Sequence, residues 1–305
     1  MIFPKTLKKG DTVGLVAPAS PIPKEQIIKC KEIVGSLGYK VVIGKSADKS
    51  FLGYLSGDDE LRAADINEMF ERKDVDGIFC LRGGYGSCRI VDKLDLEIIR
   101  SNPKVFVGYS DITILHLVFN QMCNMVTFHG PMVSSNMISQ FDDYTRKSLI
   151  DTLQMDKKLE FISPEGKKIE TLNKGFGRGL LIGGNLCLLA TSIGTPYELE
   201  TEGKILFLEE FNETSYKVDR LFQQLKQSGK LKGVKGIILG AFEKCGPEHE
   251  GDASIIEIFN DIIKPLNIPT VYDVKVGHGF PTGTLPLGAT CELDATCCNI
   301  RFTRE

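Results

Sequence analysis

The stretch from Val105 to Asp111, Val-Phe-Val-Gly-Tyr-Ser-Asp, predicts a short buried strand that ends abruptly in a helix. The helical pattern behind it places these apolar residues on one face: Ile112, Leu115, Val118, Phe119 and Met122. A strand-to-helix turn exposes a side chain, and a helix N-terminus favours a developing negative charge. Ser110 is therefore a candidate nucleophile, although Ile112 replaces the second glycine of a G-x-S-x-G turn. The alternative is that Ser110 or Asp111 only caps the helix.

The rest of the first half alternates between the same two kinds of pattern. Short apolar runs predict strands at residues 12–17, 39–43, 76–81, 105–109 and 125–128. Helical spacing of apolar residues predicts helices at residues 24–37, 59–72 and 143–153. This alternation is typical of an α/β fold with a mostly parallel sheet and right-handed crossovers.

The alternation of strand and helix patterns stops between residues 157 and 174, which are polar and contain Pro164 and Gly166. We therefore predict two domains, residues 1–160 and 161–305. In the second, strands are expected at residues 204–208, 234–242 and 269–276, helices at 216–227 and 254–263, and a β-rich tail at 289–302.

Composition excludes several classes of protein. The 305 residues carry a net charge of −3 with no block of basic residues, which argues against a nucleic-acid or anionic-membrane surface. The longest apolar run, Gly179–Gly194, is interrupted by Asn185 and is expected to be a core strand and helix. Nine scattered cysteines without a C-x-x-C pair fit reduced thiols, and residues 1–11 lack the apolar core of a secretory signal, so we expect a cytoplasmic protein. Four histidines without ligand spacing predict no metal and no cofactor.

Three further features could carry chemistry. His278 lies between two glycines at a predicted strand end, where its ring would be accessible. Glu209 and Glu210 follow the strand 204–208, and either could orient an imidazole or be a solvated loop carboxylate. Arg82–Gly86, Arg-Gly-Gly-Tyr-Gly, could present backbone N–H groups to an anion or could simply be a turn.

Taken in order, these motifs resemble those of one family. They are Ala-Pro-Ala-Ser at 17–20, Leu-Arg-Gly-Gly-Tyr-Gly at 81–86, Gly-Tyr-Ser-Asp at 108–111, His-Gly-Pro-Met at 129–132, Gly-Gly-Asn at 183–185, Leu-Phe-Leu-Glu-Glu at 206–210, Tyr-Lys-Val-Asp-Arg-Leu at 216–221 and Gly-His-Gly at 277–279. The series resembles the LD-carboxypeptidases, serine peptidases that include murein tetrapeptide carboxypeptidases and microcin-immunity peptidases.

The resemblance implies a Ser–Glu–His triad of Ser110, Glu209 and His278. It also implies an oxyanion hole formed by the N–H groups of Asp111 and Gly84. We further expect the substrate to contact four residues: Arg82, Gly83, Tyr85 and Asn185. Glu210 is then expected to face away from the imidazole, toward solvent or a neighbouring loop.

The implied fold is an N-terminal Rossmann-like or flavodoxin-like domain followed by a C-terminal swivelling β/β/α domain. Ser110 comes from the first and Glu209 and His278 from the second, so a cleft between domains is expected. Family members are usually cytosolic, metal-free homodimers.

The expected activity is release of the terminal D-alanine from a murein tetrapeptide, a small peptide substrate, in peptidoglycan recycling. Two alternatives remain. One is a microcin-immunity-type peptidase acting on acyl-sulfamoyl adenylates, and the other a non-catalytic two-lobed protein that binds a small ligand. The segment Glu213–Tyr216 departs from the Glu-Pro-Pro-Tyr of many members, which leaves substrate preference open.

Overall fold

The computed structural model describes residues 1–304, which form two compact units. The first contains Met1–Met155 and Thr284–Pro286, and the second contains Asp156–Gly283 and the chain from Leu287 onward. The sequence pattern did not predict that Thr284–Pro286 would belong to the first unit. Across residues 1–304, no helix combines the length and the apolar character needed to cross a membrane.

The first unit is built on a parallel sheet. β1 pairs with β2 on one side and β3 on the other, and β4 and β5 follow in parallel. With a further strand, β12, at one edge, the order is β12-β5-β4-β3-β1-β2. The order 2-1-3-4-5 is that of flavodoxin-like folds, so the predicted fold class is confirmed. The strands are β1 (Thr12–Val16), β2 (Lys40–Ile43), β3 (Gly77–Cys80), β4 (Val105–Gly108), β5 (Thr127–His129) and β12 (Leu285–Leu287).

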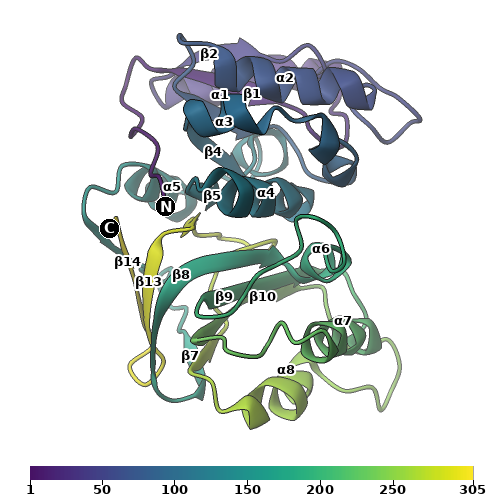
Figure 1. The fold of residues 1–305 in the computed structure, drawn as a ribbon, viewed down its shortest axis with the longest axis vertical. Helices are drawn as coiled ribbons and strands as arrows, with labels where there is room; N and C mark the ends of the chain where they lie inside the picture. Colours follow the sequence, from purple (N-terminus) through teal and green to yellow (C-terminus); the bar gives the residue numbers. More distant parts are fainter. Residues whose placement is uncertain (305) are drawn as a thin grey trace. The chain divides into compact units, whose positions relative to one another are not determined.

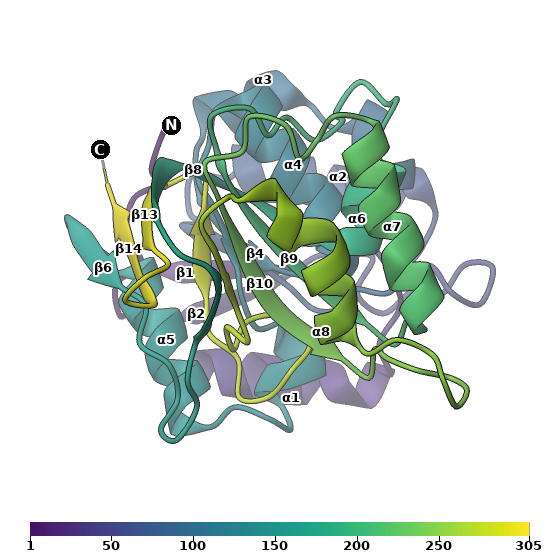
Figure 2. The same cartoon turned by 90° about the horizontal axis from the view of Figure 1, so that it is seen from below.

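Helices cover both faces of this sheet. Figure 2 shows α2, α3 and α4 on one side of β1 and β4, and α1 and α5 on the other. The five helices are α1 (Lys24–Ser36), α2 (Asp59–Glu71), α3 (Leu96–Ser101), α4 (Thr113–Cys123) and α5 (Asp143–Leu153). Short turns of 3₁₀ helix occupy Ser87–Arg89, Val91–Lys93 and Ser110–Ile112, and a π-helical turn occupies Val133–Met137. Because β3 and β4 are covered on both faces, every residue in them is buried, which explains their continuous apolar runs.

The second unit contains an eight-stranded mixed sheet in the order β6-β14-β13-β8-β9-β10-β11-β7. Its centre, β8 to β11, is parallel, and its outer strands pair antiparallel. The strands are β6 (Lys158–Glu160), β7 (Glu170–Asn173), β8 (Phe176–Asn185), β9 (Ile205–Phe211), β10 (Gly236–Glu243), β11 (Thr270–Tyr272), β13 (Thr290–Asp294) and β14 (Asn299–Thr303).

Three helices pack along this sheet, and Figure 1 shows α6, α7 and α8 following one another beside β9 and β10. They are α6 (Leu186–Thr191), α7 (Ser215–Gln227) and α8 (Ile255–Ile258), and α8 continues through a π-helical turn, Phe259–Ile263, and a 3₁₀ turn, Lys264–Leu266. Helix α7 buries Val218, Phe222 and Leu225, the apolar face that its spacing predicts.

The structure departs from the sequence analysis of this unit in two places. Residues 157–174, for which no strand was predicted, contain β6 and β7. Both strands are at sheet edges, where polar side chains are tolerated and the apolar pattern is weak. The strand predicted at 269–276 ends at Tyr272, so His278 lies in a loop beyond it.

Candidate active site

The candidate residues of the first unit all follow carboxyl ends of parallel strands. Ser20 comes after β1, Arg82–Gly86 after β3 and Ser110 after β4. β1 and β3 are the neighbours at which the strand order reverses. Open parallel sheets bind ligands at this point, outside the carboxyl ends of the strands.

Ser110 has the backbone conformation of a sharp turn. Its φ of 63° is in the left-handed region, which costs a non-glycine residue about 1–2 kcal/mol. It is the first residue of the 3₁₀ turn that leads into α4. A Cβ placed on Gly83 would lie 3.0 Å from the Ser110 Cβ and 3.2 Å from its Oγ. The glycine-rich turn therefore lies directly against the serine side chain.

Ser20 holds the glycine-rich turn in place. Its N–H donates to the Gly83 carbonyl at 3.2 Å, and its Oγ accepts from the Tyr85 N–H at 3.3 Å. Gly84, between them, has a φ of 106°, and a Cβ there would lie 2.1 Å from the Ser20 Oγ. Only glycine fits this position, so the approach of Ser20 to the turn depends on Gly84.

Two buried charged residues fix the far end of the turn. The Asp111 carboxylate accepts from the Ser87 N–H at 2.8 Å, and its burial raises its pKa. Arg62 is fully buried on α2 and donates to the carbonyls of Pro18 and Gly86, the second at 2.9 Å. The loops after β1 and β3 are thus joined through one guanidinium group. The side chain of Asp111 therefore has a structural role, and the catalytic role predicted for this residue concerns only its backbone N–H.

Glu209 and His278 form a close pair in the second unit. The His278 Nδ1 is 2.6 Å from the Glu209 Oε2, and the His278 N–H donates to the same oxygen at 3.2 Å. Glu209 is fully buried on β9. Burial alone would lower the pKa of His278, but the charge and hydrogen bond of Glu209 outweigh it and raise that pKa above its ordinary value. A Cβ on Gly277 would lie 2.6 Å from the Glu209 Oε2, so glycine permits this approach.

Glu210 faces the other side of β9, as predicted, but not toward solvent. It is buried, and its Oε1 accepts from the Asn185 Nδ2 and the Phe211 N–H, both at 2.8 Å. Its Oε2 accepts from the Cys187 N–H, also at 2.8 Å. Burial raises the pKa of Glu210. Of the two expected surroundings, solvent or a neighbouring loop, Glu210 has the second, and its carboxylate ties β9 to the start of α6.

Comparison with known proteins identifies the family. Residues 13–130 match the LD-carboxypeptidase N-terminal domain, and residues 178–293 match the LD-carboxypeptidase C-terminal domain. A probable murein peptide carboxypeptidase of Bacillus subtilis is 39% identical over 95% of this chain and 91% of its own. The chain belongs to the LD-carboxypeptidase family. The resemblance seen in the motifs is confirmed, and so is the expectation of a serine-type hydrolase.

Solved structures of LD-carboxypeptidase relatives share the fold. The microcin C7 self-immunity protein MccF, in complex with aspartyl sulfamoyl adenosine, is 26% identical, with a TM-score of 0.92 over 100% of this chain and 99% of that one. A muramoyltetrapeptide carboxypeptidase from Oxalobacter formigenes is 27% identical, with a TM-score of 0.83 over 95% of this chain and 97% of its own. The architecture of the two units is therefore that of this family.

Of the residues expected to touch substrate in this LD-carboxypeptidase, Arg82 and Tyr85 are exposed. Arg82 donates to the Pro21 carbonyl at 3.3 Å, and the Tyr85 ring lies 6.0 Å from that of Tyr54. Asn185 is buried and caps α6, since its Oδ1 accepts from the Leu188 N–H at 3.2 Å. Substrate contact remains a prediction for each residue, and for Asn185 the structure adds a structural role.

Two other histidines belong to the core of the first unit. His116 is fully buried, with Nδ1 2.8 Å from the Thr127 Oγ1 and Nε2 2.9 Å from the Gly108 carbonyl. Burial lowers its pKa to about 4, so it is neutral at pH 7. His129 is also buried, and its ring lies 5.7 Å from that of Tyr109. Within residues 1–304, no three His, Cys, Asp or Glu residues are grouped as metal ligands.

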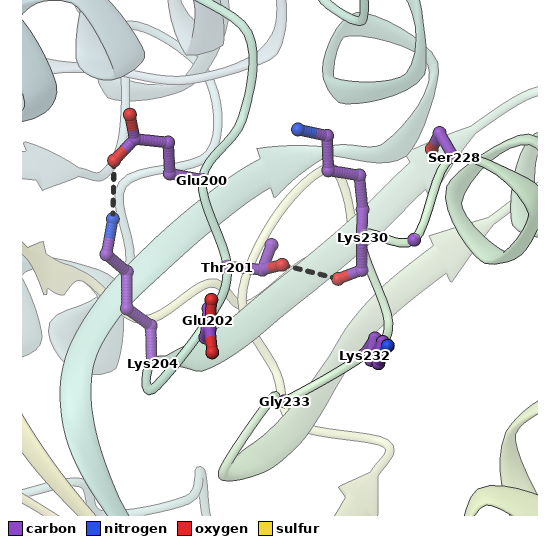
Figure 3. A pocket seen from close by; sticks show the side chains of 9 residues that line it. Glu200, Thr201, Glu202, Lys204, Ser228, Lys230, Lys232 and Gly233 are labelled. Atoms are coloured by element: carbon purple, nitrogen blue, oxygen red, sulfur yellow. Dashed lines mark hydrogen bonds and ion pairs between the residues drawn. The ribbon is translucent and has the colours of Figure 1, made fainter.

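A cavity of about 610 Å³ lies elsewhere in the second unit. Figure 3 shows Lys204, Thr201 and Lys230 among its lining residues, with the Lys204–Glu200 ion pair and the hydrogen bond from Thr201 to the Lys230 carbonyl. Lys204 directly precedes β9, whereas Glu209 is near the carboxyl end of that strand. This cavity is therefore at the opposite end of β9 from the Glu209–His278 pair.

Sequence reasoning missed three residues that shape these clusters: Ser20, Arg62 and Phe211. Ser20 is within a motif that was noticed, but no local signal connects it to the glycine-rich turn. Arg62 falls in a predicted helix of ordinary amphipathic composition. Phe211, whose ring stacks on His278, directly follows Glu210, and only the strand register reveals its position.

Proposed function

We propose that this protein is a serine carboxypeptidase that removes the terminal D-alanine from a murein tetrapeptide. The observation that carries the proposal is the 2.6 Å contact between His278 and the buried Glu209, an arrangement typical of the base and the orienting acid of a serine hydrolase. The name of the Bacillus subtilis relative supports a murein peptide as the substrate class.

In the proposed mechanism, Ser110 attacks the carbonyl carbon of the scissile amide while His278 accepts its proton. Glu209 keeps the proton on Nδ1 and stabilises the imidazolium that forms. His278 then gives the proton to the departing amine of D-alanine, and water hydrolyses the acyl-enzyme by the same sequence in reverse.

The proposed oxyanion donors are the N–H groups of Gly84 and Asp111. Each belongs to a rigid segment, the first held by Ser20 and the second at the helix start after β4. Donors fixed before the reaction need no reorganisation as charge develops, and removing one costs about 3 kcal/mol of transition-state stabilisation. Arg82, Gly83, Tyr85 and Asn185 are proposed to contact the rest of the peptide.

The test is incubation of the purified protein with murein tetrapeptide, followed by mass spectrometry. The wild type should release alanine, and Ser110→Ala should lower kcat by at least about a thousandfold with an unchanged circular dichroism spectrum. A tetrapeptide ending in L-alanine is the matched substrate control and should stay intact. Residual activity of Ser110→Ala within tenfold of wild type would remove Ser110 from the role of nucleophile.

A second candidate function is hydrolysis of acyl-sulfamoyl nucleosides, which the likeness to MccF in complex with aspartyl sulfamoyl adenosine favours. The segment Glu213–Tyr216, which leaves the substrate preference open, is anchored at Thr214 by a bridge to Gly246 and at Ser215 by a hydrogen bond to the Ala253 carbonyl at 2.5 Å. Comparing kcat/KM for the tetrapeptide and for aspartyl sulfamoyl adenosine separates the two functions. Ligand binding without turnover of either would favour a binding protein.

The proposed setting is peptidoglycan recycling in the cytoplasm, by a homodimer that binds neither nucleic acid nor membrane. Light scattering on the eluting protein tests the dimer, because a mass near 33.7 kDa would mean a monomer. Fractionation of cells expressing the native chain tests the compartment.

A further inference from the structure

Two residues near the Glu209–His278 pair have a left-handed backbone. Asn212 directly follows β9 and Lys244 directly follows β10, and their φ angles are 59° and 55°. The Asn212 N–H donates to the Glu243 carbonyl at 2.9 Å, so the two turns lie against each other. Asparagine tolerates this region, whereas lysine rarely adopts it except where the surrounding structure fixes the backbone.

Lys244 is the unpaired cation of a cavity beside these strand ends. The cavity has a volume of about 460 Å³, and Asn212 and Lys244 both line it. Its other charged lining residues are Lys217, Glu213 and Glu248. Lys217 pairs with Glu213 at 3.3 Å, whereas the Lys244 ammonium group has no hydrogen bond or ion pair with any residue in 1–304. The cavity therefore presents one ammonium group that is available to a ligand.

This ammonium group is close to the imidazole of His278. The Lys244 Nζ is 5.6 Å from the centroid of the Phe211 ring, which stacks on the imidazole with 4.8 Å between the ring centroids. The ammonium group is therefore within about 10 Å of the imidazole, a span that one amino acid bridges when its nitrogen contacts the imidazole and its carboxylate contacts the lysine.

An enzyme that removes only a terminal residue must distinguish a free carboxylate from a continuing peptide chain. In the proposed reaction His278 protonates the departing nitrogen of D-alanine, and the carboxylate carbon of D-alanine is two bonds from that nitrogen. The carboxylates of Glu210 and Glu243, which lie near the loop of His278, repel a second negative charge. A cation at this point offsets the repulsion and favours peptides that end there.

We propose that Lys244 is a specificity residue that binds the free carboxylate of the D-alanine to be released, and that the adjoining turn at Asn212 holds its backbone in place. The inference rests on the proposed function for the identity of the ligand. It deepens that function by assigning the residue that restricts cleavage to the end of the peptide. It gives Lys244 no part in proton transfer.

The experiment measures kcat/KM on the murein tetrapeptide and on the same peptide with a C-terminal amide, which lacks the charge. The wild type should prefer the acid by about tenfold or more, because a charge-assisted hydrogen bond is lost with the amide. Lys244→Met should lower kcat/KM on the acid by a similar factor, mainly through KM, because the carboxylate is bound alike in the ground and transition states. Its kcat/KM on the amide should stay near wild type.

Two variants serve as controls. Lys244→Arg keeps the charge and should keep the preference for the acid. Lys217→Met removes the paired lysine of the same cavity and should also keep it. The proposal is overturned if the wild type does not prefer the acid, if Lys244→Met keeps the wild-type preference, or if Lys217→Met loses as much of it. Equal losses of Lys244→Met on both peptides would mean a structural role and would overturn it too.

A binding measurement separates this proposal from the proposed function. The probes are N-acetyl-D-alanine and its amide, and their binding is followed by saturation-transfer NMR. The wild type should bind the acid more tightly than the amide, and Lys244→Met should bind both equally weakly. If the wild type hydrolyses neither peptide, the proposed function fails, and this measurement still decides the role of Lys244: equal binding of the acid to the wild type and to Lys244→Met overturns it.

Discussion

Glu209 and Glu210 are adjacent in sequence and face opposite sides of β9, so the same change at each should have different effects. Glu209 contacts His278 at 2.6 Å, whereas Glu210 accepts three hydrogen bonds from the β8–α6 junction and from its own strand. Glutamine has the shape of glutamate without its charge. The pair Glu209→Gln and Glu210→Gln therefore separates catalysis from structure at neighbouring positions.

Glu209→Gln should lower kcat by about three to four orders of magnitude. The glutamine can keep its carbonyl oxygen on the Nδ1 side, but it carries no charge to stabilise an imidazolium. Its amide nitrogen would then replace Oε1, a buried atom that has no hydrogen-bond partner within residues 1–304. Without the carboxylate, burial lowers the pKa of His278, so the acid limb of kcat/KM should move to lower pH.

Glu210→Gln should instead destabilise the second unit with little effect on kcat. A glutamine presents one oxygen and one NH₂ group to three N–H donors, so at least one buried donor loses its acceptor. The loss of a hydrogen bond to a buried acceptor costs about 2 kcal/mol, which lowers Tm by roughly 5 °C in a unit of this size. This is more than an exposed carboxylate would contribute.

The assay measures kcat/KM on one substrate and Tm by calorimetry for both variants and the wild type. A large kcat loss in Glu210→Gln with a normal kcat in Glu209→Gln would reassign the acid. If both variants keep wild-type kcat, the Ser–Glu–His triad is refuted, and an unchanged Tm in Glu210→Gln would refute the structural role of that residue.

Three further predictions concern the turn, the base and the core. Gly84→Ala should reduce kcat by at least tenfold, because its Cβ would lie 2.1 Å from the Ser20 Oγ. Gly10 also has a positive φ, but its added Cβ would have no atom within 4 Å, so Gly10→Ala should lower only stability, and equal kcat losses in the two variants would contradict this account. The value of kcat/KM should fall with decreasing pH through a pKa above the ordinary 6.5 of histidine, because Glu209 raises the pKa of His278, which acts as a base only when neutral. An acid limb with a pKa below 6.5 would exclude His278 as that base. The free energy of unfolding should fall by about 3 kcal/mol as pH drops from 6.5 to about 4, because the unfolded chain protonates His116 in this window and the folded chain does not. Urea titrations at these two pH values should show a weaker pH dependence for His116→Asn than for the wild type.

The parallel sheet of the first unit could be predicted because its strands are buried on both faces. β3 and β4 read as continuous apolar runs, and the helices between them show regular apolar spacing. β6 and β7 could not be found in this way, because each lies at an edge of its sheet and keeps polar side chains. The pairing that makes them strands comes from β14 and β11, which are distant in sequence.

The candidate site could be predicted only as far as local chemistry extends. The turn at Ser110 and the glycines around His278 are signals of backbone geometry that a single segment carries. The choice between Glu209 and Glu210 followed from family resemblance and strand alternation, and alternation alone could not say that Glu210 would be buried. Its burial depends on Asn185, Cys187 and the start of α6, which meet β9 only in the folded unit.

Arg62 illustrates why such residues escape sequence reasoning. Its helix has acidic residues in its first turn and is capped by Asp58, whose side chain accepts from the Leu61 N–H, so an exposed arginine on α2 would be unremarkable. In the fold it is fully buried and joins the loops after β1 and β3 through carbonyl groups, which carry no sequence signature. A buried guanidinium group destabilises a protein unless its N–H groups have partners. The contribution of Arg62 to stability therefore depends on Pro18, Gly86 and Asp59 together. The glycine-rich turn is therefore held at its start by Ser20 and at its end by Arg62. Its position depends on contacts from the loops after β1 and β3 together, and not on its own sequence alone.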